Sequence, residues 1–352
     1  MRRLQTRPRL CQKCILPETF PGIKFDEEGI CNYCRREASA VAKAPTRKAA
    51  YRQRLDELIK SIEGKAPTYD AVMAFSGGKD SSYTLKLLKE RYQLRILALT
   101  FDNHFVSPAS LGNIRKVADC LKIDHISFRP PWPTVKSIFV KTAREDIFPG
   151  PTLLRASAIC TACIGLVKSL SLKTALEQSI PLVAFGWSPG QAPIQSAIMK
   201  TNPAMTLQNQ SALKKAFPSA VRHDLDQYFI PNTYYETHEK RFPHNIHPLA
   251  FFDYNEENIM HELSDMNWQC PSDTDTNSTN CLLNAFANQC HLRRHGFHPY
   301  VWEIANMVRH GLIGRHEGIE KIYREQDEIM VEYAKERLGL RGKDTKDIHG
   351  AR

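Results

Sequence analysis

The central part of the chain alternates short apolar runs with amphipathic stretches. Apolar runs predict strands at 71–75, 94–100, 125–128 and 181–186, and helical spacing predicts helices ending near Arg91, at 111–121 and at 163–178. This alternation predicts an α/β fold with a doubly wound parallel sheet. Ligands of such sheets bind beyond the carboxyl ends of the strands. We therefore expect the loops at 76–82, 102–104 and 186–191 to meet at one edge of the sheet.

The pattern changes on either side of this region and once within it. We expect four parts: a cysteine-rich module over 1–45, a helical connector over 46–68, the main domain over 69–250 and a helical region over 251–352. The last part has helical stretches near 284–294, 300–310 and 315–338. Between about 194 and 247 the alternation is lost, and we interpret this segment as an insertion or lid.

Composition limits the class of protein. The 352 residues, 42% hydrophobic and 24% charged, are enough for a large core. No apolar run approaches the roughly 20 residues needed to span a membrane, and the N-terminus has no apolar region typical of a secretory signal. Ten cysteines without such a signal indicate metal or redox chemistry in a reducing compartment. We expect a cytoplasmic protein that does not bind membranes and forms a homo-oligomer.

The net charge of +10 is unevenly distributed. Residues 1–50 hold eleven lysines and arginines against five acidic residues. Such a segment can bind nucleic acid or another polyanion, for example a nucleotide-linked substrate. A solvated basic face is at least as good an interpretation of the charge alone.

The most specific motif is the run Ser76-Gly77-Gly78-Lys79-Asp80-Ser81-Ser82, between a predicted strand and a predicted helix. Two glycines let the backbone turn tightly and approach a ligand. The N–H groups of the turn and the helix N-terminus form an anion site, to which Lys79 adds a positive charge. The spacing differs from that of a Walker loop. The alternative is a serine-rich helix cap after a buried strand.

Four cysteines near the N-terminus have the spacing of a metal site. Cys11 and Cys14 form one C-x-x-C pair, and Cys31 and Cys34 form a second. Sixteen residues lie between the two pairs. Two such pairs supply the tetrahedral set of thiolates that zinc prefers. Four protein ligands leave no open position, so we expect a structural zinc ion. Free thiols or an iron centre are the alternatives.

A second C-x-x-C pair, Cys160 and Cys163, precedes a predicted helix and has no matching pair nearby. It could be a redox dithiol, half of a metal site, or two ligands of a cluster with a third cysteine elsewhere. Cys270, Cys281 and Cys290 are candidates for the third, and we choose Cys281 because it lies in a small polar stretch. Two reduced structural thiols at a helix start are the alternative.

The run at 76–82 resembles the PP-loop of the ATP pyrophosphatases, whose fold is that of the adenine nucleotide alpha hydrolases. Most of the chain is similar to the N-acetyl sugar amidotransferases, bacterial PP-loop enzymes of surface-polysaccharide biosynthesis. The similarity is carried by the segment Cys11–Cys34, the loop, 100–104, 124–128, Cys160–Cys163, 180–186, Cys281, and the tail segments 295–297 and 308–318. It is weakest between about 187 and 247.

One stretch departs from the sugar family. Where that family tends to have Gly-Glu-Asn after the fourth strand, this chain reads Gly186-Trp-Ser-Pro-Gly-Gln-Ala-Pro193. The chain is also similar in short features to the tRNA thiolation enzymes, which combine a PP-loop with an internal C-x-x-C and a distant cysteine that hold an iron–sulfur cluster.

Both resemblances imply that ATP and Mg²⁺ bind along the loop and that a substrate carbonyl oxygen is adenylated with release of pyrophosphate. The implied nucleotide-binding residues are Ser76, Gly77, Gly78, Lys79, Asp80, Ser81, Ser82, Asp102 and Gly186. Lys79, Asp80, Cys160, Cys163 and Cys281 are the implied catalytic residues.

The two resemblances differ in the second half-reaction. The first implies an amidotransferase that uses ammonia from a separate glutaminase and a small acceptor such as a nucleotide-linked sugar. The second implies a sulfurtransferase with a sulfur-donor partner, tRNA or a small molecule as acceptor, and a [4Fe-4S] cluster on Cys160, Cys163 and Cys281. We expect amidation, because that resemblance covers more of the chain. A non-enzymatic zinc-ribbon adaptor for nucleic acid is the third hypothesis, and the intact loop argues against it.

Overall fold

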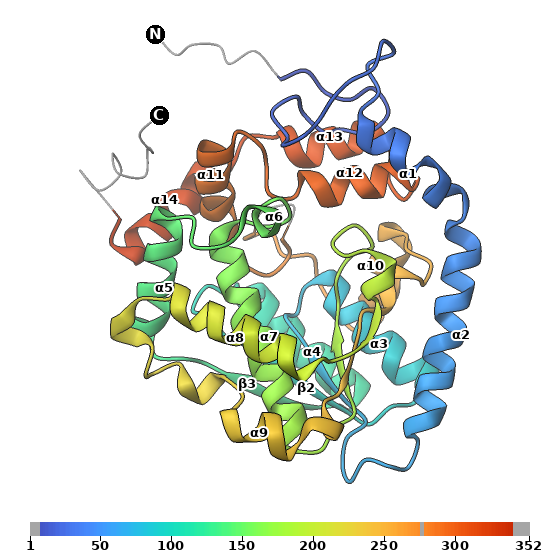
Figure 1. Cartoon of the computed structure of the whole chain (residues 1–352), viewed down its shortest axis with the longest axis vertical. Helices are drawn as coiled ribbons and strands as arrows, with labels where there is room; N and C mark the ends of the chain where they lie inside the picture. The colour runs from blue at the N-terminus through green and yellow to red at the C-terminus, as the bar shows by residue number, and fades with distance from the viewer. Residues whose placement is uncertain (1–7, 275–277, 341–352) are drawn as a thin grey trace.

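The computed structural model describes residues 8–274 and 278–340 (Figure 1). A six-stranded sheet forms its centre, with strand order β3-β2-β1-β4-β6-β5. The strands are β1 (Ala71–Ala74), β2 (Ile96–Phe101), β3 (Asp124–Phe128), β4 (Leu182–Phe185), β5 (Ile198–Lys200) and β6 (His244–Ile246). All neighbouring pairs are parallel except β5 and β6. The order reverses between β1 and β4, which makes this the switch point of the sheet.

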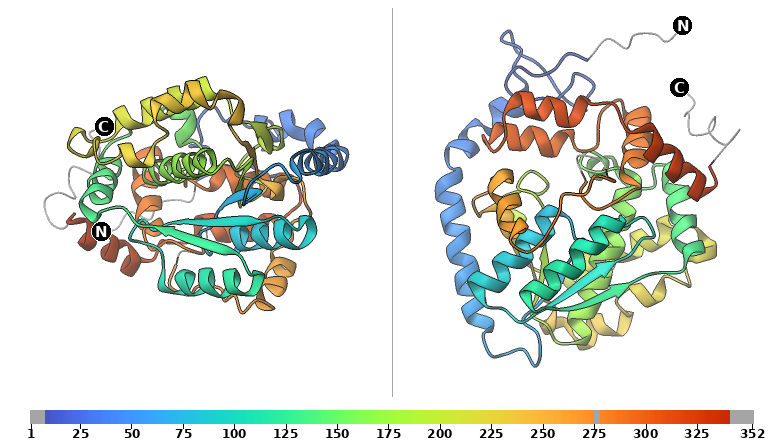
Figure 2. Two further views of the ribbon diagram at one scale, coloured as in Figure 1. Left: turned by 90° about the horizontal axis from the view of Figure 1, so that it is seen from below. Right: turned by 180° about the vertical axis from the view of Figure 1, so that it is seen from behind.

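Helices cover both faces of the sheet (Figure 2). Ala71 and Met73 of β1 belong to one apolar cluster, with α3 (Lys79–Tyr92) and α4 (Pro108–Leu121). Val72 belongs to a second cluster, with α5 (Trp132–Arg144) and α7 (Ala158–Glu177). Alternate residues of a strand point to opposite faces, so β1 is buried on both sides. The predicted doubly wound α/β fold is confirmed.

The segment without a predicted fold adds two short strands to the sheet. Its elements are η1 (Ile194–Ser196), β5, α8 (Pro203–Ala216), η2 (Ser219–Val221), η3 (Asp226–Tyr228), α9 (Asn232–Thr237), η4 (Glu239–Arg241) and β6. Phe217, Tyr228 and Phe242 are buried in the second cluster. The segment is therefore built into the edge of the sheet. The turn η5 (Pro248–Ala250) and helix α10 (Glu256–Ser264) follow, and α6 (Gly150–Leu153) precedes α7.

The N-terminal module packs on two helices of the C-terminal region (Figure 1). The N-terminal module leads into α1 (Asn32–Ala42) and α2 (Ala44–Ile62) and contacts the C-terminal helices α12 (Val301–Arg309) and α13 (Arg315–Tyr323). Phe20 stacks on Trp302 with 5.5 Å between ring centroids, and Tyr323 Oη donates to Ile15 O at 2.8 Å. The region also contains α11 (Asn284–His295) and α14 (Glu328–Leu338).

One predicted helical stretch, 315–338, is wrong as a single helix. It is two helices, α13 and α14, separated at 324–327. Asp327 starts the second one, because its side chain accepts from the backbone N–H groups of Ile329 and Met330.

Within the described residues, α7 is the single helix long and apolar enough to cross a membrane. More than half of it is buried inside the protein, against β1, α5 and α11. Its apolar surface is therefore used in the core.

Candidate active site at the carboxyl edge of the sheet

Three predicted loops meet where the parallel strands end. β1 pairs with both β2 and β4, all in the same direction. The loop at 76–82 follows β1, the turn at 102–104 follows β2, and Gly186 follows β4. The edge therefore carries all three loops at the switch point of the sheet, the position at which ligands bind in open α/β folds.

The loop after β1 depends on its two glycines. Gly77 has φ +73°, and a Cβ on it would lie 2.5 Å from Ser110 O. A Cβ on Gly78 would lie 2.9 Å from Thr279 Oγ1. Gly78 is the N-cap of α3, so the loop leads directly into a helix N-terminus. We call residues 76–82 the PP-loop, after the motif that their sequence resembles.

Lys79 of the PP-loop is held in a buried polar network. Its ammonium donates to Tyr254 Oη at 2.6 Å and lies 3.2 Å from a carboxylate oxygen of both Asp80 and Glu256. Tyr254 Oη in turn donates to Asp80 Oδ1 at 2.9 Å. Lys321 reaches the other Glu256 oxygen at 3.1 Å. The C-terminal region thus supplies two of the three groups around the PP-loop lysine, Tyr254 and Glu256.

The charges in this network support one another. Burial disfavours the charged form of Lys79, but Asp80 and Glu256 outweigh it and raise its pKa. Burial likewise disfavours the Glu256 carboxylate, but Lys79 and Lys321 lower its pKa. The pKa of Tyr254 is raised well above its ordinary value, chiefly by burial. Lys79 is therefore a firmly protonated cation at the start of α3.

The PP-loop serines differ in what they contact. Ser76 Oγ and Ser81 Oγ lie 3.1 Å apart, and Ser81 Oγ donates to Gly78 O at 3.1 Å. Ser82 is fully buried, and its hydroxyl has no hydrogen-bond partner within residues 8–274 and 278–340. A buried hydroxyl without a partner is uncommon.

Asp102 is engaged within its own turn. Its carboxylate accepts from the N–H of His104 at 2.9 Å and lies 3.4 Å from the guanidinium of Arg129. His104 has φ +69°, so the carboxylate stabilises a left-handed position. The structure therefore places Asp102 at the expected edge and gives it a role in the turn itself.

Gly186 lets β4 approach the PP-loop helix. A Cβ on Gly186 would lie 2.4 Å from the Cα of Ser81, which no side chain could tolerate. Farther along the same loop, Ser188 Oγ donates to a carboxylate oxygen of Glu303, on α12. Burial raises the pKa of Glu303 to about 7, and the charge of Asp80 adds to the effect, while the Ser188 hydrogen bond opposes it. The loop from Gly186 thus joins α3 to α12.

The second group of cysteines forms at the same edge. Cys160 and Cys163 lie in the first two turns of α7, three residues apart and so on one face of the helix. Cys281 comes from the segment before α11, which pairs with the chain after β2: Val106 bridges Cys281, and Leu282 N donates to Phe105 O at 2.8 Å. Asn103 Nδ2 donates to Cys163 Sγ at 3.5 Å and to Cys281 Sγ at 3.8 Å.

These three thiols are partly accessible but lie deep in the protein. Burial raises the pKa of Cys160 and of Cys163 to about 12, and a negative charge on Cys281 adds to both shifts. Burial also raises the pKa of Cys281. Without a cation these thiols stay protonated, and a bound metal would supply the charge that their thiolate forms lack. Among the described residues, the four N-terminal cysteines are the group whose sulfur atoms lie close enough to share one metal ion, so a metal or cluster on these three thiols is a proposal.

The other cysteines lie elsewhere. Cys290 is buried in the second apolar cluster, while Cys120 and Cys270 are exposed. Of the candidates for a third ligand, the structure brings Cys281 to the pair at the start of α7.

Thr279 connects the three thiols to the PP-loop. Its Oγ1 accepts from the backbone N–H of Lys79 at 3.1 Å, and its carbonyl accepts from Ser110 Oγ at 2.9 Å. Cys281 lies two residues farther along, which is about 7 Å of extended chain. The thiol group and the anion site are therefore close neighbours.

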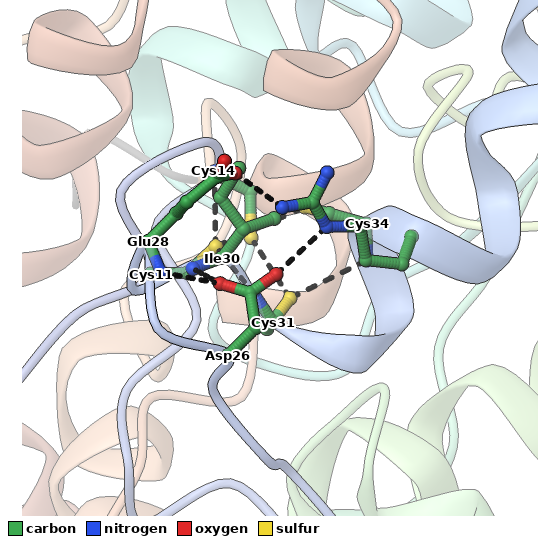
Figure 3. A network of polar contacts seen from close by, with 8 residues as sticks. Cys11, Cys14, Asp26, Glu28, Ile30, Cys31 and Cys34 are labelled. Carbon is green, nitrogen blue, oxygen red and sulfur yellow. Dashed lines mark hydrogen bonds and ion pairs between the residues drawn. The ribbon is translucent and has the colours of Figure 1, made fainter.

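The N-terminal cysteines form a separate, closed group (Figure 3). Their four sulfur atoms all lie within 4.8 Å of one another, with 3.9 Å between Cys11 and Cys34 and 3.8 Å between Cys14 and Cys31. A tetrahedral ion with ~2.3 Å bonds to sulfur separates its ligands by about 3.8 Å. Arg309 donates to Cys14 Sγ at 3.5 Å. The set fits a tetrahedral ion bound by four thiolates.

Several residues of the site were not singled out from the sequence. Asn103, Tyr254, Glu256, Thr279 and Glu303 all act through contacts with distant parts of the chain; the Lys79–Tyr254 pair, for example, spans 175 residues. The polar stretch before Cys281 gave some indication of Thr279, since such stretches form site loops. Nothing near Glu303 distinguishes it from an ordinary acidic residue of a helix.

Comparison with known proteins gives distant relatives. No family model matches the chain. A protein of Methanocaldococcus jannaschii, described as uncharacterized, is 22% identical over 315 residues, which cover 87% of this chain and 90% of that protein.

Several solved structures are similar, and three of them illustrate the range. The tRNA U34 thiolase NcsA of Methanococcus maripaludis, with its [4Fe-4S] cluster, has a TM-score of 0.35 at 14% identity and covers 97% of this chain and 92% of its own. A predicted subunit of a tRNA methyltransferase from M. jannaschii has a TM-score of 0.30 at 20% identity and covers 55% of this chain and 74% of its own. The NH3-dependent NAD synthetase of Campylobacter jejuni, with a nitrate ion, has a TM-score of 0.28 at 14% identity and covers 62% of this chain and 94% of its own. At this distance, the site is interpreted from its own residues.

Proposed function

We propose that the protein uses ATP to adenylate a carbonyl oxygen of an acceptor, releasing pyrophosphate. The observation that carries this is the PP-loop at the switch point, with Lys79 charged and the helix N-terminus of α3 behind it. Phosphate groups are favoured at such a terminus. The unpartnered hydroxyl of Ser82 is a further donor for a phosphate oxygen.

In this reaction the acceptor oxygen attacks the α-phosphorus, the bond between the α-phosphorus and its bridging oxygen breaks, and pyrophosphate leaves. Lys79 and the backbone N–H groups stabilise the charge that gathers on the phosphates. Asp80 is the carboxylate at the loop that would hold Mg²⁺. Lys79 must then exchange a contact with Glu256 or Tyr254 for one with phosphate.

For the second half-reaction we favour sulfur transfer over the amidation that the longer resemblance implies. The reason is the group of Cys160, Cys163 and Cys281 next to the PP-loop, in which Asn103 donates to both Cys163 and Cys281. Cys160, Cys163 and Cys281 would hold a [4Fe-4S] cluster, and such a group would supply sulfide for the transfer. Sulfide then attacks the activated carbon, the carbon–oxygen bond breaks, and AMP leaves with the former carbonyl oxygen.

Zinc is the ion that we assign to the four-cysteine group. It takes four thiolates at tetrahedral positions, and such closed sites are structural. The sulfur separations of 3.8 and 3.9 Å agree with this assignment.

Amidation remains the second candidate. It is supported by the unit formed by the N-terminal module and helices α12 and α13, the parts that resemble the sugar amidotransferases. In that reaction ammonia replaces sulfide, the product is an amidine, and a separate glutaminase supplies the ammonia.

The test is an anaerobic assay with ATP labelled at the α-phosphate, Mg²⁺, added sulfide and ammonia, and either a tRNA pool or N-acetylated nucleotide sugars as acceptor. We expect acceptor-dependent AMP and pyrophosphate, with sulfide incorporated in the wild type and not in Cys160→Ala. Incorporation of ammonia by both proteins would favour amidation. Absence of AMP with every acceptor would reject both enzymes.

A further inference from the structure

A cavity of about 610 Å³ lies beside the candidate active site. Its walls come from the junction of α1 and α2, from the loop 189–195, from Arg155 ahead of α7, and from α12. This volume is within the roughly 300–1,000 Å³ typical of small-ligand sites.

The walls of the cavity are basic. They carry five arginine and lysine side chains, Arg36, Arg47, Lys48, Arg52 and Arg155, and two carboxylates, Glu37 and Asp253.

Both carboxylates already have cationic partners. Glu37 lies 3.1 Å from Arg309, outside the cavity wall, and Asp253 lies 3.6 Å from Arg52. In the part of the chain that the structure describes, the side chains of Arg47, Lys48 and Arg155 form no ion pair or hydrogen bond within contact distance, and the guanidinium of Arg36 lies over the ring of Tyr33. Burial lowers the pKa of Lys48, and the charge of Asp253 opposes this shift only in part.

The cavity is connected to both halves of the candidate active site. The loop 189–195 on its wall begins at Gly186, which packs on the PP-loop helix. Asn306 Nδ2, also on the wall, donates to Gly190 O at 3.1 Å. Arg155 lies five residues before Cys160. A ligand anchored in the cavity can therefore extend toward the edge of the sheet where ATP and the three thiols are placed.

We propose that this cavity binds the phosphate-bearing part of the acceptor, at the size of a nucleoside diphosphate. Over the described ranges 8–274 and 278–340, Arg36, Arg47 and Arg155 have no carboxylate partner, and Lys48 has only the nearby Asp253, which pairs with Arg52. Such a group of cations around one cavity is suited to two adjacent phosphate groups, since arginine and lysine form their strongest hydrogen bonds with such anions. The phosphates belong either to a nucleotide-linked small molecule or to the backbone of an RNA. The identification of this ligand as the acceptor depends on the proposed function.

The experiment measures binding by calorimetry, with the full chain and the PP-loop site saturated with Mg²⁺ and a non-hydrolysable ATP analogue. The two probes are uridine diphosphate and a short oligouridylate. The test variant is Lys48→Gln with Arg155→Gln, and the matched control is Lys60→Gln with Arg115→Gln, which lie outside the cavity. We expect the Kd for uridine diphosphate to rise about tenfold or more in the test variant and to stay within about twofold in the control.

A larger effect on the oligouridylate than on uridine diphosphate would assign the phosphates to RNA. Equal affinities in test and control variants for both probes would overturn the proposal. The ATP assay is read separately: if the cavity variant alone weakens probe binding but no acceptor yields AMP, the phosphate site stands and its role as acceptor site fails.

Discussion

The two groups of cysteines in this protein are built differently. The four N-terminal thiols are at most 2% exposed, lie within 4.8 Å of one another and receive N–H groups from the backbone and a guanidinium group from Arg309. The three thiols at the sheet edge are partly accessible and come from two distant segments, and two of them, Cys163 and Cys281, share the amide donor Asn103. The first group has a complete set of ligands for an ion, whereas the second lacks a fourth.

We infer from this difference that the four N-terminal thiols have a structural role and that the three thiols at the sheet edge take part in the reaction. A closed set holds the fold together, and an open set leaves room for a reactant. Helix α12 connects the two regions, because Arg309 at its end contacts Cys14 and Glu303 near its start contacts Ser188 of the active-site loop. We therefore infer that the N-terminal module supports the active site through the C-terminal helices.

The largest effect on stability should come from removing one ligand of the closed set, the four cysteines Cys11, Cys14, Cys31 and Cys34. Cys14→Ala removes one of four ligands, and structural zinc sites contribute on the order of 10 kcal/mol of binding free energy. We expect loss of zinc, measured by atomic emission, and a collapse of the thermal transition. Cys160→Ala should keep both zinc and the transition, and Cys120→Ala, an exposed cysteine, is the control. Equal destabilisation by Cys14→Ala and Cys160→Ala would remove the distinction.

Lys79→Met should act on chemistry with little effect on zinc. Loss of a positive charge that stabilises the phosphates should slow AMP formation by about 10²–10³-fold. The matched control is Lys86→Met, on the same helix, because Lys86 also pairs with two carboxylates, those of Glu90 and Glu262. A similar loss of rate in both variants would show that the effect is not specific to the PP-loop.

Asn103→Asp tests the open set directly. The carboxylate keeps the acceptor oxygen used by the N–H of Phe105 but removes the amide donor to Cys163 and Cys281. Losing such an outer contact costs about 10–100-fold in metal affinity. We expect iron to be lost to a chelator faster than from the wild type, with zinc unchanged. Identical iron loss in both proteins would exclude Asn103 as a supporting group.

The smallest effect concerns pH. Because burial raises the pKa of Glu303 from 4.5 to about 7, its contribution to stability is fully present below about pH 4.5 and is lost as pH rises through about 7. Glu303→Gln removes this titration, so its thermal midpoint should vary less between these pH values. Calorimetric scans at several pH values measure it. Parallel curves for the two proteins would contradict the assigned burial.

Much of the fold could be predicted from the sequence, because β1, β2 and β4 are apolar runs and the helices beside them have regular spacing. β5 and β6 were not predicted, because each has three residues, too few to show the alternation of apolar and polar residues that indicates a strand. The closed cysteine set was predictable from its spacing. The network around Lys79 was not, since Tyr254 and Glu256 reach it only through the tertiary fold.

The most direct test is the count of iron and zinc per chain in anaerobically purified protein, compared with Cys160→Ala. We predict zinc at the four-cysteine group in both proteins, and roughly four iron atoms per chain in the wild type alone. Zinc without iron in both proteins would contradict the open cluster site and return the second half-reaction to amidation.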